Sequence, residues 1–285
     1  MDKPLLSILM TAYNREGFIS EAIESALSSS LVNFELIILD DASTDNTFKI
    51  ASEFENLDKR IRLYRNENNL GQFATRNKIV SFASAEYIMW LDSDDKTFDF
   101  SFKYCLDEML ADKYADIGML CFHPPLFGKV LSPQESIQYH FNQKQFLTVG
   151  PGGTILKKSF FNIIGGFSEK YGPANDMYFN LKAASFGNLK CLEKVFLFYR
   201  EHDGQERNNP ASYVSNGYLY MNDALTDLPL SLTEKEKFFF SRKNKRRFIV
   251  NTFKYFLKYK SFAKIFAIIK NAKFSFKDLL QGIFN

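Results

Sequence analysis

The chain has 285 residues, of which 46% are hydrophobic, 16% aromatic and 24% charged. This apolar content excludes a chain that is disordered throughout, and the length allows one sizeable core with a small appendage. The formal net charge is only +3, but the segment from Lys235 to Lys277 holds 14 basic residues against one acid, a net of +13. Such a concentration of positive charge in one segment is typical of a region that binds an anionic partner.

Several function classes are excluded by missing motifs. The three cysteines, Cys105, Cys121 and Cys191, are far apart and odd in number, which favours buried free thiols over a disulfide or zinc framework. No His-Glu-x-x-His motif is present, so we expect no zinc protease. The apolar run at 5–10 is too short for a signal peptide, and no run of about 18 apolar residues predicts a spanning helix. We therefore expect a cytoplasmic protein.

The first third of the chain alternates between two hydrophobic periods. Short apolar runs at 5–11, 34–39, 61–64 and 87–91 predict buried strands, and apolar residues at helical spacing predict helices at 18–27, 48–57 and 72–83. Such alternation predicts an α/β fold with a mostly parallel sheet flanked by helices.

The rest of the chain is less regular. We predict helices at 102–110 and 177–184, strands at 117–122 and 192–199, a turn at 150–153, and a short helix that ends at Gly165 and Gly166. The basic region starts just after 227–233, which is therefore the expected boundary. This predicts two regions, one at 1–230 and a basic amphipathic helical region at 231–285.

Carboxylates follow two of the predicted strands, at the sheet edge where α/β proteins bind ligands. Asp92, Asp94 and Asp95 come directly after 87–91. Their mutual repulsion would be relieved by a hard divalent cation, although a solvated turn with capping aspartates explains the same residues. Asp41 follows the strand at 34–39 and can accept the ring N–H of a pyrimidine base. Helix capping is its alternative role, and the one we expect for Ser43.

The ordered set of motifs is more specific than any one of them. Residues 7–14 (SILMTAYN), 35–45 (ELIILDDASTD), 69–77 (NLGQFATRN) and 89–95 (MWLDSDD) are followed by Gly152-Gly153, 157–161, 164–169, Asn175-Asp176 and 199–202. In this order they resemble glycosyltransferase family 2, the inverting, nucleotide-sugar-dependent enzymes with the GT-A fold. The resemblance extends over roughly residues 5 to 207. It implies that 1–230 is a GT-A catalytic domain, with a nucleotide-binding half at 1–95 and an acceptor-binding half at 96–230.

The resemblance implies a role for each matching position. Asp176 corresponds to the catalytic base, and Asp94 to the metal ligand of the Asp-x-Asp motif, with His202 close to where some members contact the metal or diphosphate. The positions that correspond to nucleotide-sugar contacts are Thr11, Tyr13, Arg15, Asp41, Arg76, Asp92 and Ser93. The implied cofactor is Mg²⁺ or Mn²⁺, the implied donor a UDP-sugar, and the implied acceptor a glycan or a lipid-linked sugar of cell-surface polysaccharide or glycoconjugate synthesis.

Two departures from the family pattern matter. Asn175 stands where the family usually has Glu before the catalytic Asp, which removes an acid often associated with acceptor binding. The Gln-x-x-Arg-Trp motif of processive synthases is absent, because 205–208 reads Gln-Glu-Arg-Asn. We therefore expect single addition of a sugar.

The basic region interleaves aromatic residues with lysine and arginine. Apolar residues at 248, 249, 252, 253 and 256 share one helix face, and those at 262, 265, 266 and 269 share another. Two interpretations stay open: residues 235–285 lie on an anionic membrane surface, peripheral to the inner face of the cell membrane, or they pack on the catalytic domain. No recognised motif predicts nucleic-acid binding.

Two further functions compete with transfer. A sugar nucleotidylyltransferase would have a Gly-rich basic loop after the first strand, where this chain has Thr11-Ala12-Tyr13-Asn14. A non-catalytic, membrane-associated scaffold with a degenerate transferase fold is the other alternative, and the retained Asp41, Asp94 and Asp176 argue against it.

Overall fold

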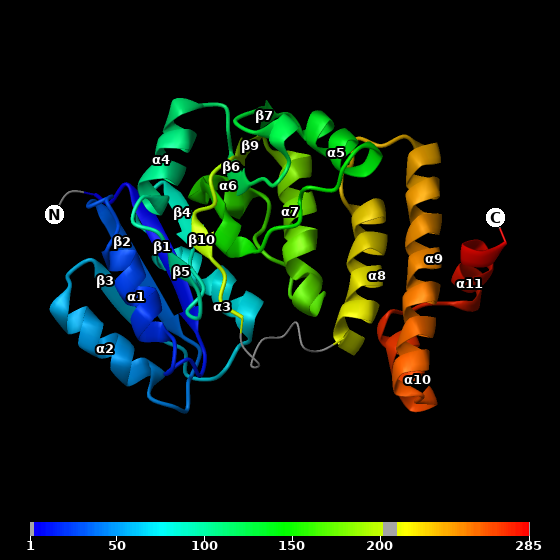
Figure 1. Cartoon of the computed structure of the whole chain (residues 1–285), viewed down its shortest axis with the longest axis horizontal. Coiled ribbons are helices and arrows are strands. Elements are labelled where there is room, and N and C mark those ends of the chain that lie inside the picture. Colours follow the sequence, from blue (N-terminus) through cyan, green and yellow to red (C-terminus); the bar gives the residue numbers. More distant parts are fainter. Residues whose placement is uncertain (1–2, 202–209, 285) are drawn as a thin grey trace. The chain divides into compact units, whose positions relative to one another are not determined.

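The computed structural model describes residues 3–201 and 210–284. The chain forms two compact units (Figure 1). The first, unit 1, consists of Met1–Ser132, Phe146–Phe167 and Gly187–Arg200, and the second, unit 2, of Pro133–Gln145, Ser168–Phe186 and Glu201–Asn285. The division into 1–230 and 231–285 that we expect from the sequence stays a prediction.

Unit 1 is built on an eight-stranded sheet of order β3-β2-β1-β4-β8-β6-β9-β7. Strands β3, β2, β1 and β4 run parallel, β8 is antiparallel to both of its neighbours, β6 and β9 pair parallel, and β7 is antiparallel at the edge. The strands are β1 (Leu6–Ala12), β2 (Phe34–Asp40), β3 (Ile61–Arg65), β4 (Tyr87–Trp90), β6 (Ile117–Leu120), β7 (Val130–Leu131), β8 (Thr154–Lys157) and β9 (Leu189–Leu192). A separate pair joins β5 (Lys96–Thr97) to β10 (Leu197–Phe198).

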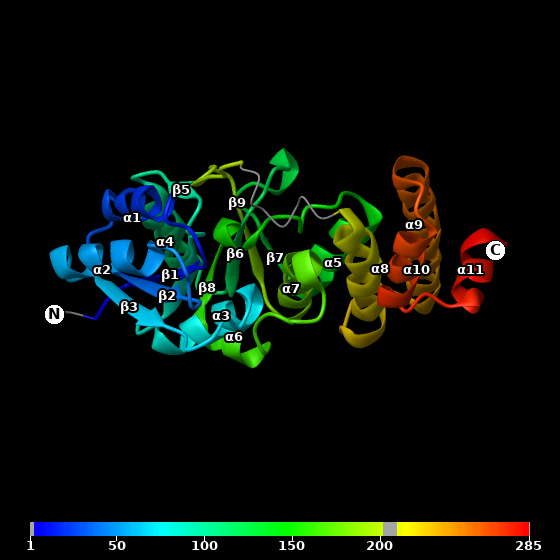
Figure 2. The same ribbon diagram turned by 90° about the horizontal axis from the view of Figure 1, so that it is seen from below.

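Helices cover both faces of this sheet, with α1, α2 and α4 on one side and α3 and α6 on the other (Figure 2). Residues of β1, β2 and β4 are almost all buried, as expected of parallel strands with helices on each face. The helices are α1 (Ile19–Leu27), α2 (Thr47–Leu57), α3 (Gln72–Ile79), α4 (Ser101–Ala111) and α6 (Lys158–Ile163), with 3₁₀ turns at Val80–Phe82, Pro124–Leu126 and Pro151–Gly153. The fold class predicted from the sequence is confirmed.

Most predicted elements of unit 1 are confirmed to within one or two residues at each end. The helix predicted at 72–83 continues as a 3₁₀ turn from Val80. The strand predicted at 192–199 is wrong: β9 ends at Leu192 and β10 holds only Leu197–Phe198. The apolar run at 192–199 favours one continuous strand. After Leu192, however, the chain leaves the large sheet, and Leu197–Phe198 pair with β5 instead. The three cysteines are free and buried, as predicted.

Unit 2 is helical in the part of it that the structure describes. Its helices are α5 (Pro133–Asn142), α7 (Asn175–Phe186), α8 (Pro210–Asp227), α9 (Glu234–Tyr259), α10 (Phe262–Asn271) and α11 (Phe276–Ile283), with a 3₁₀ turn at Gly172–Ala174. Capping boxes start α9 at Thr233 and α11 at Ser275, and the Ser261 hydroxyl caps α10. No described helix is both long enough and apolar enough to cross a bilayer.

A buried carboxylate ties the parallel strands together at the end where β2 begins. Glu35 accepts hydrogen bonds from the Ser7 hydroxyl (2.6 Å) and from the amide and hydroxyl of Ser84 (both 2.7 Å), and it pairs with Arg62 at 2.9 Å. Burial raises the pKa of Glu35, but these hydrogen bonds outweigh it and hold the pKa below its ordinary value. The contacts fix β1, β2, β3 and the approach to β4 in register.

We expect Glu35→Gln to lower the free energy of unfolding at pH 7 by about 2 kcal/mol, because the buried donors lose a charged acceptor. A depressed pKa stabilises the fold above the unfolded-state pKa, and this stability is lost as the pH falls through the folded-state pKa. The difference between wild type and variant should therefore shrink below about pH 4. Urea titrations across pH measure it, with the exposed Glu24→Gln as control. A pH-independent difference would contradict the assignment.

Candidate functional site

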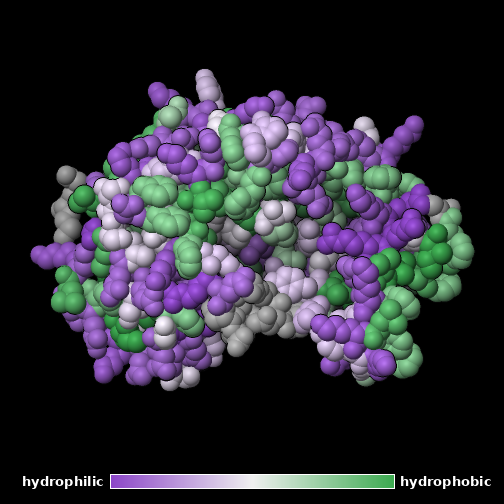
Figure 3. Space-filling model, in the orientation of Figure 1, coloured by the Kyte–Doolittle hydropathy of each residue, from purple (hydrophilic) through white to green (hydrophobic). Residues whose placement is uncertain are grey.

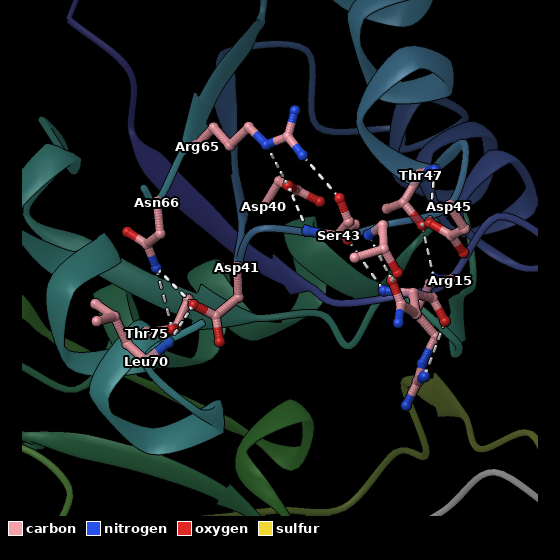
Figure 4. Close-up of polar contacts among 12 residues, drawn as sticks. Arg15, Asp40, Asp41, Ser43, Asp45, Thr47, Arg65, Asn66, Leu70 and Thr75 are labelled. Carbon is pink, nitrogen blue, oxygen red and sulfur yellow. Dashed lines mark hydrogen bonds and ion pairs between the residues drawn. The ribbon is translucent and has the colours of Figure 1, made fainter. Parts of the chain in front are cut away.

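The candidate site lies where β1, β2 and β4 end, side by side in the sheet. Parallel neighbours present their carboxyl ends at one edge, which is where such sheets bind ligands. Arg15 joins three of the segments that leave this edge. Its amide donates to Thr47 Oγ1 at the start of α2 at 2.7 Å (Figure 4). Its Nε donates to Asp94 Oδ2 after β4 at 3.0 Å.

Asp41 is buried directly after β2, and both of its carboxylate oxygens accept hydrogen bonds. Oδ1 accepts from Asn66 Nδ2 (2.8 Å) and the Leu70 amide (2.9 Å), and Oδ2 accepts from the Gly71 amide (2.9 Å) (Figure 4). A carboxylate has about four acceptor positions, so these three donors leave room for one more on Oδ2. Asp41 thus holds the loop before α3 and can still receive an N–H from a ligand.

Two non-glycine residues beside the strand ends have left-handed backbone. Ala42 has φ 60°, and Asn14 has φ 52°, a conformation that costs alanine about 1 kcal/mol or more. The surroundings hold both: Asn14 Oδ1 accepts from the Thr44 amide (2.9 Å), and the Asn14 amide donates to Ser43 Oγ (3.0 Å). Backbone strain concentrated at a sheet edge is typical of functional loops.

The prediction that Ser43 caps the following helix is wrong. Helix α2 begins at Thr47, and the Ser43 hydroxyl instead accepts from Asn14, which binds the loop after β2 to the loop after β1. Asp45 serves the helix start, because its Oδ1 accepts from the Thr47 amide at 2.9 Å. The sequence motif alone does not indicate whether the Ser43 hydroxyl or the Asp45 carboxylate accepts from the amide at the start of α2.

The three carboxylates after β4 have different partners. Asp92 Oδ1 pairs with the fully buried Arg76 (2.6 Å), and Asp94 pairs with Arg15. Asp95 is buried and accepts from the Arg200 amide at 2.9 Å. Burial, together with the charges of Asp92 and Asp94, raises the pKa of Asp95 to about 7 despite the Arg200 hydrogen bond. The cluster is therefore held close and is under mutual repulsion.

Sequence reasoning missed two residues that complete this edge. Arg200 pairs with Glu21 on α1 (3.2 Å) and lies over the Phe18 ring (5.2 Å), while Lys96 also pairs with Glu21. The Arg200 amide also donates to Asp95 Oδ1. Two residues 105 positions apart in the sequence therefore meet just after β4. The only available signal was the position of Arg200 in the motif at 199–202.

The remaining predicted residues fall in different places. Thr11 lies near the end of β1, Tyr13 is exposed just beyond it, and Ser93 is buried between Asp92 and Asp94. Asp176 lies in the first turn of α7, within unit 2. His202 lies outside the described residues.

The carboxylates at this edge could serve as ligands of a divalent ion. No group of three or more His, Cys, Asp or Glu side chains with metal-binding geometry occurs among residues 3–201 and 210–284. A magnesium-type ion needs only one or two protein carboxylates when substrate phosphates supply the other ligands. Asp92 and Asp94 fit this smaller requirement, because a further positive charge near them would offset the carboxylate charges that, together with burial as the larger cause, raise the pKa of Asp95.

Comparison with known proteins decides the family. Residues 7–161 match the family described as Glycosyl transferase family 2. The chain belongs to this family. It is 31% identical to an uncharacterized glycosyltransferase of Methanocaldococcus jannaschii over 237 residues, which are 77% of this chain and 78% of the relative. The protein is therefore a glycosyltransferase, as the sequence motifs predicted.

A second relative has a more specific description. The UDP-Glc:α-D-GlcNAc-diphosphoundecaprenol β-1,3-glucosyltransferase WfgD of Escherichia coli is 31% identical over 202 residues, which are 69% of this chain and 76% of the relative. The chain spans a smaller share, 20–57%, of the length of six further curated relatives.

Solved structures with low sequence identity share the fold. TarS 1–349 of S. aureus in complex with UDP-GlcNAc has a TM-score of 0.70 at 19% identity, over 98% of this chain and 81% of that one. The mannosyltransferase PcManGT of Pyrobaculum calidifontis, in complex with GDP-Man and Mn²⁺, has a TM-score of 0.65 at 13% identity, over 98% and 83%. These likenesses establish the GT-A type of fold.

We expect Asp41→Ala to release the loop before α3, because the amides of Leu70 and Gly71 lose their acceptor. Hydrogen exchange of residues 66–76 should become about tenfold faster or more, which corresponds to a local loss of roughly 1.4 kcal/mol. Mass spectrometry of deuterated peptides measures this, with the exposed Glu53→Ala on α2 as the control. Exchange as slow as in wild type would show that the loop does not depend on Asp41.

Proposed function

We propose that this glycosyltransferase moves a sugar from a UDP-sugar to a glycan or lipid-linked acceptor with inversion, in the synthesis of a polysaccharide or glycoconjugate. The observation that carries this proposal is the cluster of Asp92, Asp94 and Asp95 beside Arg15 and Arg76, at the same sheet edge as Asp41. Relatives and neighbours named for UDP-glucose and bound to UDP-GlcNAc support the choice of donor.

Each residue at the edge has a role suited to a nucleotide. The Oδ2 atom of Asp41 keeps an acceptor position for the ring N–H of uracil, next to the loop that it already holds. Tyr13 is 43% exposed and offers a ring on which a base can stack. Arg76 pairs with Asp92 and would hold that carboxylate for the ribose, and Ser93 and Thr11 are the further contacts that we propose. The arrangement thus binds the base and ribose along β1 and β2.

The metal that we propose is Mg²⁺ or Mn²⁺, held by Asp94 with help from Asp92, and by His202 outside the described residues. When bound, it would neutralise the charge that develops on the departing diphosphate. Arg15 now pairs with Asp94, so binding of the ion would free this guanidinium group for the diphosphate oxygens.

We propose Asp176 as the base that accepts the proton of the acceptor hydroxyl. A sugar hydroxyl is a weak nucleophile, and proton removal during its attack on the anomeric carbon makes a single displacement feasible. One displacement inverts the anomeric centre and needs only one base. The start of α7 supports an ionised carboxylate there, because a helix N-terminus favours negative charge.

Replacing Asp176 by Asn should reduce transfer by 10²- to 10⁴-fold, because the base is lost while the size of the side chain is kept. The affinity for UDP should stay within about twofold of wild type. UDP release from UDP-sugars with an acceptor present measures turnover, and calorimetry measures binding. The matched control is Asp227→Asn, an exposed carboxylate of the same unit. Full turnover by Asp176→Asn would remove it from the role of base.

Asp94→Ala should weaken UDP binding in the presence of Mn²⁺ by about tenfold or more, since it removes the proposed metal ligand. In EDTA the variant and the wild type should bind UDP alike. Calorimetric titration in both conditions separates these cases, with Asp107→Ala on α4 as control. Equal binding with Mn²⁺ would contradict the assignment of Asp94, and no binding by wild type would direct the search to GDP or dTDP.

A further inference from the structure

The C-terminal helices are a packed part of unit 2. Helices α9 and α10 pack on α8 through a buried cluster of Tyr218, Phe248, Tyr255, Ile268 and Ala272. Helix α11 packs on α9, where Lys245 binds Asp278 (3.1 Å) and Gln281 (2.5 Å). Gly282 allows this approach, because a Cβ there would lie 2.7 Å from Ile249 Cδ1. The packing interpretation of 235–285 therefore accounts for part of its apolar surface.

A second set of aromatic side chains stays on the surface of the same helices. Phe253, Phe262, Phe266 and Phe276 are 59%, 78%, 70% and 74% exposed. Phe253, Phe262 and Phe276 line a groove of about 420 Å³ formed by α9, α10 and α11. Figure 3 shows hydrophobic residues gathered at the right, over the helices labelled α10 and α11 in Figure 1, with hydrophilic residues beside them. This surface is defined as the phenylalanine face.

The helices that carry the phenylalanine face are rich in lysine, and the acid of α11, Asp278, is paired with Lys245. Seven lysines and no acid occur from Lys254 to Lys277, and all seven are exposed: 254, 258, 260, 264, 270, 273 and 277. Lys245 differs from them, because it is buried against Asp278 and serves the packing of α11. The exposed lysines of 254–277 are thus available to a partner.

We propose that the phenylalanine face docks on an anionic lipid surface, with the four phenyl rings entering the headgroup region and exposed lysines of 254–277 contacting lipid phosphates. Short basic helices with an aromatic face are typical of interfacial binding, and each lysine near an anionic membrane favours it. A second copy of the chain fits poorly, because a twofold contact would place seven lysines opposite the same seven lysines. The docking does not depend on the proposed donor, metal or base.

Removal of the whole region is a poor test, because it would expose Tyr218 of α8, which packs in the buried cluster with Phe248 of α9. Point substitutions on the exposed face avoid this. The first variant is Phe253→Ser/Phe266→Ser/Phe276→Ser. Its matched control removes three exposed apolar side chains from unit 1, Leu57→Ser/Phe122→Ser/Ile163→Ser, which are 84%, 68% and 78% exposed. A third variant, Lys254→Gln/Lys270→Gln/Lys277→Gln, has Lys49→Gln/Lys59→Gln/Lys113→Gln as its control.

The experiment is co-sedimentation of the full chain with phosphatidylcholine vesicles that contain 0 or 30% phosphatidylglycerol. Wild type and both controls should pellet with the anionic vesicles and be released by salt. The Phe variant should bind at least tenfold more weakly, and the Lys variant roughly a hundredfold, because each lysine contributes about fivefold. Circular dichroism and the melting temperature establish that each variant is folded.

Depth of insertion gives a second measurement that a packing role would not change. Phe266→Trp should show a blue-shifted emission with anionic vesicles and quenching by brominated acyl chains, above the background of Trp90, which is buried in β4. Wild-type binding by the folded Phe variant, an unquenched Phe266→Trp, or no pelleting of wild type would each overturn the proposal. Concentration-dependent dimerisation that the Phe variant abolishes, without vesicle binding, would assign the face to a second copy.

Discussion

Asp41 lies nearly out of water at the carboxyl end of β2, where an ionised carboxylate is stable only if donors surround it. The donors come from Asn66, Leu70 and Gly71, so the loop after β3 must close over the end of β2. This closure sets the start of α3 and therefore the position of Arg76, which reaches Asp92 after β4. The need of the buried Asp41 carboxylate for hydrogen-bond donors thus links the segments after β2, β3 and β4.

The two ends of the sheet use buried carboxylates differently. At the beginning of β2, Glu35 is fully surrounded by Ser7, Ser84 and Arg62, and it holds the strands in register. At the other end, three carboxylates are held close together by two arginines and one backbone amide, and the pKa of Asp95 is raised to about 7. Glu35 is thus a structural tie between strands, whereas the carboxylates after β4 are where we propose a divalent cation.

Unit 2 separates its charges and aromatic residues in a similar way. Lys245 and Phe248 are buried and hold α11 and α8 against α9. Lys254 and Phe253, less than three turns further along α9, are exposed. Composition alone gave one basic aromatic region, whereas the packing divides it into a part that stabilises the helices and a part that is open to a partner.

The sequence by itself determined the alternation of strands and helices, because buried parallel strands and amphipathic helices have distinct hydrophobic periods. It also placed Asp41, Asp92 and Asp94 at strand ends, and its ordered motifs predicted the family. Only the tertiary structure decided that Arg15 pairs with Asp94, that Ser43 binds Asn14 rather than a helix end, and that Arg200 meets Asp95. The residues in these three contacts are 29 to 105 positions apart in the sequence. A local sequence pattern cannot show which distant segments lie side by side once the sheet has formed.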